Sequence, residues 1–319
     1  MSSDAGSPSG ARRTRAESGV LLVSHGTVDR LDDLPAFVTN VRRGHAPAPD
    51  VTMELRRRYE AIGGISPLNA TSALLAERLG GTLGVPVAWA NRLWKPYVRD
   101  VLRIMAAGGV RRVVVVPLAP FSTHVYEADA RQSALAQSET AGIEIACVTN
   151  WGEHPKLVSA FVERIEHALA QASEWDRTTL ILTAHSLPRA IVDRGDPYER
   201  DVRAAAEAIA DRMRQRIGRP VRWALAFQSQ GMSGAASAWL GPDVRTVLEH
   251  AAARGDAGVV VAAIGFLADH VETLYDLDIE SRTMARERGL AFARARSLDA
   301  DADLVEILGD LARPLLPND

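Results

Sequence analysis

The chain has 319 residues, which is enough for two domains of about 150 residues that each bury a core. Its 40 acidic and 37 basic side chains, with a pI near 6.3, exclude a general positive field for nucleic acid or for an anionic membrane. No apolar run approaches the roughly 18 residues that cross a bilayer, and the single cysteine, Cys147, excludes a disulfide framework and a thiolate-built metal site.

Residues 1–18 consist mainly of Ser, Gly, Ala and Arg, and they contain no apolar segment typical of a secretory signal. Such a composition cannot build a core, so we expect a disordered N-terminal tail. With neither a signal nor a membrane-spanning run in view, we expect a cytoplasmic enzyme.

From Gly19 onward, short apolar segments alternate with amphipathic ones, which is typical of parallel strands covered by helices on both faces. We predict strands at 19–24, 86–90, 112–118, 143–148, 178–184, 222–228 and 257–265. We predict helices at 68–80, 97–108, 155–172, 199–217 and 243–254.

This layout occurs twice, over 19–150 and over 151–319. The expected fold class is therefore α/β, with two doubly wound, Rossmann-like parallel-sheet domains and an active-site cleft between them. The boundary near Asn150 is soft, because chains of this type often send a terminal helix across to the other domain.

Ligands of such sheets bind beyond the carboxyl ends of the strands. Imidazoles and small polar side chains follow several of the predicted strands at that end. The segments concerned are Ser24-His25-Gly26-Thr27, Ser122-Thr123-His124, His185-Ser186, Ser229-Gln230 and His270-Val271-Glu272. We therefore expect the functional residues of both halves to gather at these ends.

His185 follows a predicted strand directly and precedes Ser186, Leu187 and Pro188. The proline fixes the backbone just beyond the imidazole, which favours a held ring. A loop histidine that hydrogen-bonds a carbonyl fits the position equally well. A serine nucleophile at Ser186 is excluded, because the Gly-x-Ser-x-Gly motif is missing and Pro188 forbids a helix running on from the serine.

Glu272, Asp276 and Glu280 lie four residues apart, so on an α-helix they would form one stripe of carboxylates. A solvated helix face is the ordinary explanation of such a stripe. Here the stripe starts directly after a buried strand, and no lysine or arginine follows before Arg282. These features favour a path that delivers a divalent cation through hard oxygen ligands.

Two basic clusters lie in the first half, Arg42-Arg43-Gly44 and Arg56-Arg57-Arg58-Tyr59. Exposed arginine clusters are often only solubilising. The second cluster precedes the Gly- and Pro-rich segment 63–67, which is typical of a binding loop, and arginine forks grip carboxylates bidentately. An acid-bearing ligand would suit them.

Several of these segments resemble the ferrochelatase family, in the family's order and over about residues 19–280. Arg58-Tyr-Glu-Ala-Ile-Gly-Gly-Ile-Ser-Pro-Leu68 is similar to its N-terminal substrate loop, and Thr183-Ala-His-Ser-Leu-Pro188 to its catalytic-histidine motif. The similar segments further along the chain are Gly195-Asp-Pro-Tyr198, Gln228-Ser229, Trp239-Leu-Gly-Pro242 and Gly265-Phe-Leu-Ala-Asp-His-Val-Glu-Thr-Leu274. The short Arg42-Arg43-Gly44 loop resembles the coproporphyrin III type of the family.

The resemblance implies an enzyme that inserts Fe²⁺ into a porphyrin during heme biosynthesis, with coproporphyrin III favoured over protoporphyrin IX. It implies that His185 and Glu272 face each other across the reaction centre as the metal-binding, proton-accepting pair, and that Asp276 and Glu280 extend an acidic metal path. The residues that it places against the porphyrin or its propionates are Arg42, Arg58, Tyr59, Ser66 and, as a pocket residue, Tyr126. No organic cofactor is implied, and with one cysteine we expect no iron–sulfur cluster. The expected partners are the porphyrin, ferrous iron and, in transient contacts, neighbouring enzymes of the heme pathway.

His25 departs from the family pattern. The coproporphyrin III type often has a tyrosine after the first strand, where it ligates the product iron, and this chain has Ser24-His25-Gly26-Thr27. That opening is similar to the smaller sirohydrochlorin-type chelatases, in which such a histidine serves the metal. We expect His25 to face the macrocycle opposite His185. Two alternatives stay open, a cobalt or nickel chelatase of a reduced tetrapyrrole and a two-domain protein that binds heme or metal without turnover.

Overall fold

The computed structural model describes residues 15–171, 175–230 and 238–318. Within these residues the strands form two four-stranded sheets, and every strand pair is parallel. The first sheet has the order β2 (Val87–Asn91), β1 (Ser18–Ser24), β3 (Arg112–Pro117) and β4 (Glu144–Cys147). The second has the order β6 (Trp223–Gln228), β5 (Thr178–His185), β7 (Gly258–Ala262) and β8 (Ala291–Arg294). The predicted α/β class with two doubly wound sheets is confirmed.

Helices occupy the connections between the strands and the end of the chain. In the first half they are α1 (Leu34–Val41), α2 (Pro49–Ala61), α3 (Leu68–Leu83), α4 (Val98–Ala107) and α5 (Thr123–Leu135). They continue with α6 (Pro155–Leu169), α7 (Arg189–Val192), α8 (Tyr198–Ile217) and α9 (Val244–Ala253). The last are α10 (Val271–Leu274), a π-helix (Asp276–Ser281), α11 (Arg282–Glu287) and α12 (Ala302–Ala312).

Each of the seven predicted strands overlaps a strand of the structure, and β8 is the one that the sequence did not predict. β8 is a short edge strand whose four residues include Arg294, so it lacks the continuous apolar run that marks the others. At the N-terminus, residues 15–17 form a short 3₁₀ turn and Ser18 already begins β1, so regular structure starts before the predicted end of the tail. Residues 1–14 lie outside the described residues.

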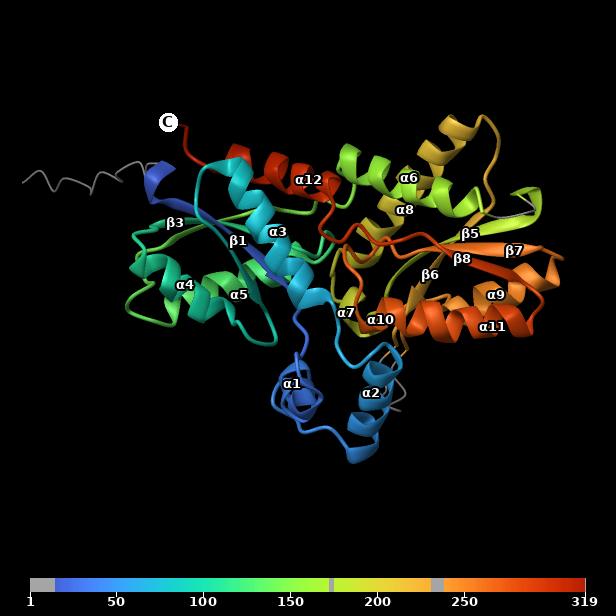
Figure 1. Ribbon diagram of the computed structural model, residues 1–319, viewed down its shortest axis with the longest axis horizontal. Helices are drawn as coiled ribbons and strands as arrows, with labels where there is room; N and C mark the ends of the chain where they lie inside the picture. Colours follow the sequence, from blue (N-terminus) through green and yellow to red (C-terminus); the bar gives the residue numbers. More distant parts are fainter. Residues whose placement is uncertain (1–14, 172–174, 231–237, 319) are drawn as a thin grey trace, which may run out of the picture.

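Strands β1 and β5 lie inside their sheets and are almost wholly buried, and helices cover both faces of each sheet (Figure 1). Their side chains alternate between the two faces. In β1, Val20 and Leu22 point into a core shared with α3, α6 and α12, whereas Leu21 and Val23 pack against α4 and α5. In β5, Leu180 enters the same shared core and Ile181 packs against α9.

The shared core joins the two halves of the molecule. The C-terminal helix α12 contacts α6 and also reaches α3 and β3 of the first half (Figure 1). At its start, the Arg78 guanidinium of α3 donates to the Ala300 carbonyl. The assignment of 19–150 and 151–319 to separate domains stays a prediction, with α12 packed across both.

Helices α1 and α2 form an excursion between β1 and β2, and they project from the body of the molecule at the lower side of Figure 1. A separate apolar cluster holds them, consisting of Val28, Leu34, Phe37, Val38, Tyr59 and Trp94. This cluster follows the carboxyl end of β1, so the excursion lies at the edge where ligands bind in such sheets. No helix of the described residues is long and apolar enough to cross a membrane.

Candidate active site

His185 is the last residue of β5 and sits at the carboxyl edge of the second sheet. Its backbone carbonyl accepts a hydrogen bond from the Tyr198 hydroxyl at 2.9 Å. The following residue, Ser186, is fully buried and donates from its backbone to Gln228 and from its hydroxyl to Leu240. The backbone that carries the imidazole is therefore fixed at His185 itself and at Ser186.

Glu272 comes from the segment that follows β7, the strand next to β5. Gly265 lets this segment approach β5 closely, because a Cβ at position 265 would lie 2.7 Å from Cα and Cβ of Ala184. The Gln228 side-chain amide, at the end of β6, then ties β5 to this segment. It accepts from the Thr183 hydroxyl at 2.7 Å and donates to the Glu272 carbonyl at 3.0 Å.

His185 and Glu272 are in direct contact, with Nδ1 of the imidazole 3.0 Å from Oε2 of the carboxylate. The expectation that they face each other across the reaction centre is therefore wrong, since both belong to the same wall. β5 and β7 are neighbours in one parallel sheet, so the side chains beyond their carboxyl ends meet. An ionised carboxylate can only accept, so Nδ1 donates, and in the neutral ring the lone pair is on Nε2.

The pair is polarised toward imidazolium and carboxylate. Burial acts to lower the pKa of His185, but the neighbouring Glu272 carboxylate outweighs burial and the pKa is raised above its usual 6.5. Burial likewise acts to raise the pKa of Glu272, but His185 outweighs it and the pKa falls well below 4.5. Both side chains keep about a third of their surface exposed, 36% and 33%. They are thus surrounded by protein and still open to solvent, as at the wall of a cleft.

His25 lies directly beyond β1 and belongs to the same site. The residue is exposed, yet desolvation by the surrounding protein lowers its pKa below 6.5. Both Glu272 and His185 act on that pKa through their charges, so the three side chains are electrostatic neighbours. Nδ1 of His25 lies 3.3 Å from the Gly26 carbonyl, and its ring packs edge-on against Phe37. A neutral imidazole that donates through Nδ1 has its lone pair on Nε2, where it can accept a proton or ligate a metal.

The turn after His25 is fixed by a chain of buried amides and hydroxyls. Gly26 has φ near 101°, and a Cβ there would lie 2.9 Å from Cβ of Asn91. Asn91 accepts from the Ser24 hydroxyl at 2.9 Å and donates to Asn69 at 3.0 Å. Thr27, one residue further, shares a 2.7 Å hydrogen bond with the Tyr59 hydroxyl. These hydrogen bonds fix the backbone turn and thereby the direction of the His25 side chain.

The predicted carboxylate stripe has a different geometry in the structure. α10 ends at Leu274, and Asp276 starts a π-helix in which the Glu280 N–H donates to the Tyr275 carbonyl at 2.9 Å. The α-helical spacing assumed for Glu272, Asp276 and Glu280 is therefore wrong, because the π-turn inserts an extra residue. Glu280 is exposed on this π-helix, whereas Asp276 is buried.

Asp276 is also not an unpaired carboxylate. Arg58 of α2 donates to it at 3.0 Å, and Ser229 donates through its hydroxyl. The interpretation of an unpaired stripe rested on neighbours in sequence, and the arginine that pairs with Asp276 lies 218 residues away. Burial, followed by repulsion from Glu272, nevertheless raises the pKa of Asp276 to about 6.

The residues predicted to contact the porphyrin lie at several depths. Arg42 follows the end of α1 in the excursion and is exposed. Arg58 is committed to Glu54 and Asp276, and its guanidinium stacks 4.9 Å from the Tyr275 ring centroid. The others are buried: Tyr59 of α2 in the apolar cluster of the excursion, Ser66 in the loop before α3, and Tyr126 of α5 in the core against the first sheet.

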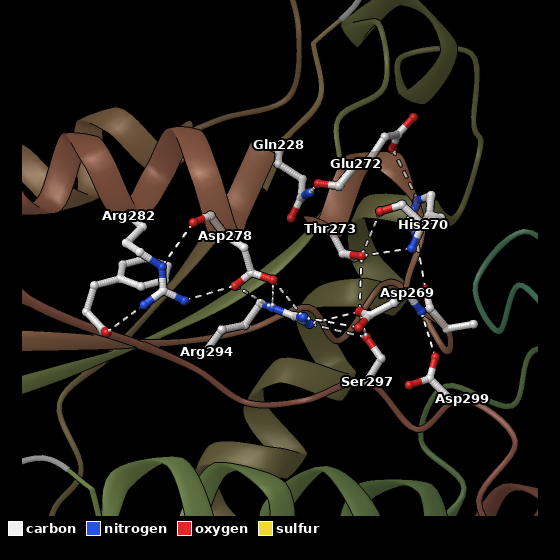
Figure 2. Close-up of polar contacts among 12 residues, drawn as sticks. Gln228, Asp269, His270, Glu272, Thr273, Asp278, Arg282, Arg294, Ser297 and Asp299 are labelled. Carbon is white, nitrogen blue, oxygen red and sulfur yellow. Dashed lines mark hydrogen bonds and ion pairs between the residues drawn. The ribbon is translucent and has the colours of Figure 1, made fainter. Parts of the chain in front are cut away.

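Four residues at or beside this site were not among the predicted site residues, although Gln228 and His270 lie in segments that the sequence singled out. Gln228 ties Glu272 to β5 as described above. His270 has Nε2 at 3.8 Å from Oε2 of Glu272, and Arg92 contributes to the lowered pKa of His25. Arg294 belongs to the polar network under α10 that Figure 2 shows. Gln228 ends β6 and Arg92 directly follows β2, so their places at the carboxyl ends of strands could have pointed to both. No sequence signal marks Arg294.

Among the described residues, no three His, Cys, Asp or Glu side chains converge to hold a metal ion. A cavity of about 250 Å³ lies at the amino ends of the second sheet's strands, where its lining includes Thr178, Leu180 and Arg222. This cavity is about 20 Å along β5 from His185, at the end opposite the site.

A model of the ferrochelatase family matches residues 17–315. A ferrochelatase from Herpetosiphon aurantiacus is 33% identical over 303 residues, covering 92% of this chain and 97% of the relative. A coproporphyrin III ferrochelatase from Frankia alni is 36% identical over 320 residues, covering 95% of this chain and 82% of the relative.

Among solved structures, the sirohydrochlorin chelatase SirB from Bacillus subtilis subspecies spizizenii, in complex with cobalt, has a TM-score of 0.58 at 14% identity, over 94% of this chain and 96% of that one. The siroheme-biosynthesis enzyme CbiX of denitrifying bacteria has a TM-score of 0.52 at 14% identity, over 94% and 100%. At this identity the likeness concerns the fold alone. The extent of the family match, together with relatives above 30% identity over nearly the whole chain, identifies this protein as a member of the ferrochelatase family and thus as a metal-insertion enzyme.

Proposed function

We propose that this enzyme inserts Fe²⁺ into a porphyrin in heme biosynthesis, with coproporphyrin III as the preferred porphyrin. The observation that carries the proposal is the 3.0 Å contact between His185 and Glu272 at the open carboxyl edge of the second sheet, with His25 as an electrostatic neighbour. The reaction needs a base for the pyrrole protons and an anionic group that binds the cation while it loses its water ligands. This pair supplies both.

The geometry gives each residue a step. Nδ1 of His185 is engaged by Glu272, so Nε2 is the atom that accepts a pyrrole proton. Because the resting pair is polarised toward imidazolium, the ring must first be made neutral. A divalent cation that reaches Glu272 compensates the carboxylate charge, and this favours release of the Nε2 proton of His185 to solvent, to which the side chain is open. Nε2 then accepts the two pyrrole protons in turn and passes the first to solvent before it takes the second.

Strain in the macrocycle is the remaining requirement. A flat porphyrin must bend so that its nitrogen lone pairs face the metal, at a cost of about 1–5 kcal/mol. Contacts far from the nitrogens supply this energy best, because they are made in full only as the ring bends. In this proposal Arg42, exposed at the end of α1, binds a propionate.

The preference for coproporphyrin III rests on charge and on relatives. This porphyrin carries more propionates than protoporphyrin IX, and Arg42 and Arg43 are both exposed at the excursion. Relatives named coproporphyrin III ferrochelatase are 36% and 32% identical to this chain. We further propose that the enzyme works in the cytoplasm, without an organic cofactor or an iron–sulfur cluster and with transient contacts to neighbouring enzymes of the pathway.

The second candidate is a cobalt or nickel chelatase of a reduced tetrapyrrole, which His25 beyond β1 favours. To separate the two, purified enzyme is incubated anaerobically with Fe²⁺, Co²⁺ or Ni²⁺ and with coproporphyrin III, protoporphyrin IX or sirohydrochlorin, and absorbance is followed. We expect the highest kcat/KM for Fe²⁺ with coproporphyrin III.

Faster insertion of Co²⁺ or Ni²⁺ into sirohydrochlorin would favour the second candidate. Binding of heme or metal without turnover on any of these pairs would mean a binding protein. The His185→Ala variant is the control for insertion that occurs without the enzyme.

A further inference from the structure

The guanidinium of Arg294, at the end of β8, lies between two carboxylates under the active site (Figure 2). Its Nε is 3.0 Å from both oxygens of Asp278, and its two terminal nitrogens are 3.0 and 3.2 Å from the oxygens of Asp269. Only 9% of the Arg294 side chain is exposed. Because the buried guanidinium is planar and binds a carboxylate on each of two edges, it holds the two acids at a fixed distance from each other.

The two acids flank the segment that carries Glu272. Asp269 precedes α10, and Asp278 lies in the π-helix that follows it. Asp269 is itself fixed from several sides: its carboxylate accepts from Ser297 at 2.6 Å and from Thr273 at 3.1 Å, and its N–H donates to Asp299 at 2.8 Å. Asp278 also accepts from Arg282 at 3.1 Å (Figure 2).

Glu272 and Asp276 point away from this network and toward the site. Glu272 reaches His185, and Asp276 reaches Arg58 and Ser229, whereas Asp278 turns toward Arg294. The acidic side chains of this segment therefore lie on two sides of it. On the site side, Glu272 is paired with His185 and Asp276 with Arg58. On the inner side, Asp278 is paired with Arg294 and Arg282.

We propose that Arg294 is a positioning residue for metal insertion: by holding Asp269 and Asp278 at a fixed separation, it sets the course of α10 and the π-helix and keeps the Glu272 carboxylate on His185. This inference rests on the proposed function for its chemistry. Arginine is required because its planar fork engages two carboxylates at once, whereas lysine offers one point charge.

The test compares Arg294→Lys and Arg294→Gln with a matched control, Arg288→Gln. Arg288 directly follows α11 and pairs with Glu249 at 2.8 Å, outside the network. We expect both Arg294 variants to lose roughly 10–100-fold in kcat, as for other groups that orient catalytic ligands, with the lysine variant less affected. KM for the porphyrin should stay at the wild-type value, because no group that contacts the propionates has changed.

A second readout does not depend on turnover. The His185 pKa, measured by NMR of the labelled imidazole, should fall toward its usual value in the Arg294 variants, because Glu272 moves away from the ring. A residue that supports only the fold would lower the melting temperature and leave this pKa unchanged. Asp278→Asn preserves the side-chain shape and is the substitute if Arg294→Gln does not fold.

If Arg294→Lys and Asp278→Asn keep the kcat and the His185 pKa of the wild type, or lose no more than Arg288→Gln, the proposal is wrong. Failure of the proposed function looks different. In that case the wild-type enzyme inserts Fe²⁺ into none of the porphyrins, while the NMR titration still decides whether Arg294 positions Glu272.

Discussion

At the scale of single residues, the site contrasts two imidazoles in different electrostatic states. His185 is paired with a carboxylate and has a raised pKa, whereas His25 donates to a backbone carbonyl and has a lowered one. The first is suited to proton transfer and the second to ligation as a neutral base. Because the expected roles differ, each histidine is tested separately.

Replacing His185 by alanine should abolish most turnover while the fold and porphyrin binding persist. Loss of a general base typically costs about 10²–10⁴-fold in rate. Stopped-flow insertion assays give kcat, and fluorescence quenching of the free porphyrin gives its affinity. A variant that retains a tenth or more of the wild-type kcat would show that His185 is not the base.

For His25, we expect ligation of the iron in the product. Neutral imidazole ligates ferrous iron better than a neutral phenol does. His25→Ala should therefore change the Soret and charge-transfer bands of the bound product and alter its release more than insertion. His25→Tyr should give a phenolate-like spectrum. Resonance Raman decides the point: an iron–ligand mode identical in wild type and His25→Ala would leave this histidine a structural residue.

Arg42 tests the choice of porphyrin. Because Arg42 would bind a propionate far from the reacting nitrogens, Arg42→Ala should raise KM for coproporphyrin III more than it lowers kcat. Its neighbour Arg43, with φ near 54°, is a poor site for substitution, so Arg99→Ala on α4 is the control. Equal KM values for variant and wild type with both porphyrins would make Arg42 a surface charge.

At the scale of elements, the π-helix after α10 is the feature that most affects the site. It buries Asp276 beside Glu272 and raises the pKa of Asp276 to about 6, chiefly through burial. In the unfolded chain an aspartate titrates near 3.9. The folded state therefore binds the proton more tightly, and the ionised form of Asp276 costs stability.

Replacing Asp276 by asparagine should make the metal-free protein more stable at pH 7, by about 2 kcal/mol. In the wild type, the contribution of Asp276 to the unfolding free energy is favourable below about pH 4 and is lost as the pH rises through about 6. Asparagine does not titrate. The gain in unfolding free energy should therefore grow over this window. Urea titrations with a chelator present measure it, with exposed Glu280→Gln as control. A gain that is independent of pH would contradict the assignment.

How far the sequence predicts these elements depends on how local each signal is. Strands such as β1 and β5 are continuous apolar runs, so they are found from sequence alone. β8 and the π-helix are not, because β8 is stabilised by pairing with β7 and the π-turn by contacts such as Arg294–Asp278. The pairing of Arg58 with Asp276 joins residues 218 positions apart and follows only from the fold.

The site residues follow the same rule. His185 and Glu272 could be selected because each follows an apolar strand, where parallel sheets place their ligands. Their direct contact could not, because the sequence does not say that β5 and β7 are neighbours. Tyr59 and Tyr126 matched the family's pattern, and their burial in apolar clusters depends on packing that no local pattern reports.

At the scale of the whole molecule, one core serves both sheets. Leu308 of α12 is fully buried in this core, which also contains Val20 of β1 and Leu180 of β5. Leu308→Ala should cost about 2–5 kcal/mol of unfolding free energy. Because the core is shared, hydrogen exchange at β1 and at β5 should accelerate together. Two separate unfolding transitions, only one of which is shifted by Leu308→Ala, would show that the halves fold independently.

The continuity of this core also has a mechanical consequence. His25 stands on one sheet and His185 on the other, and α12 packs across both supporting layers, so the two walls of the site resist being pushed apart. A ring that is squeezed between stiff walls must itself deform, whereas yielding walls would let it stay flat. The excursion formed by α1 and α2 rests on a small cluster of its own. For the proposed porphyrin, we therefore expect entry and exit past α1 and α2, and we expect the rigidly connected sheets to favour its bending.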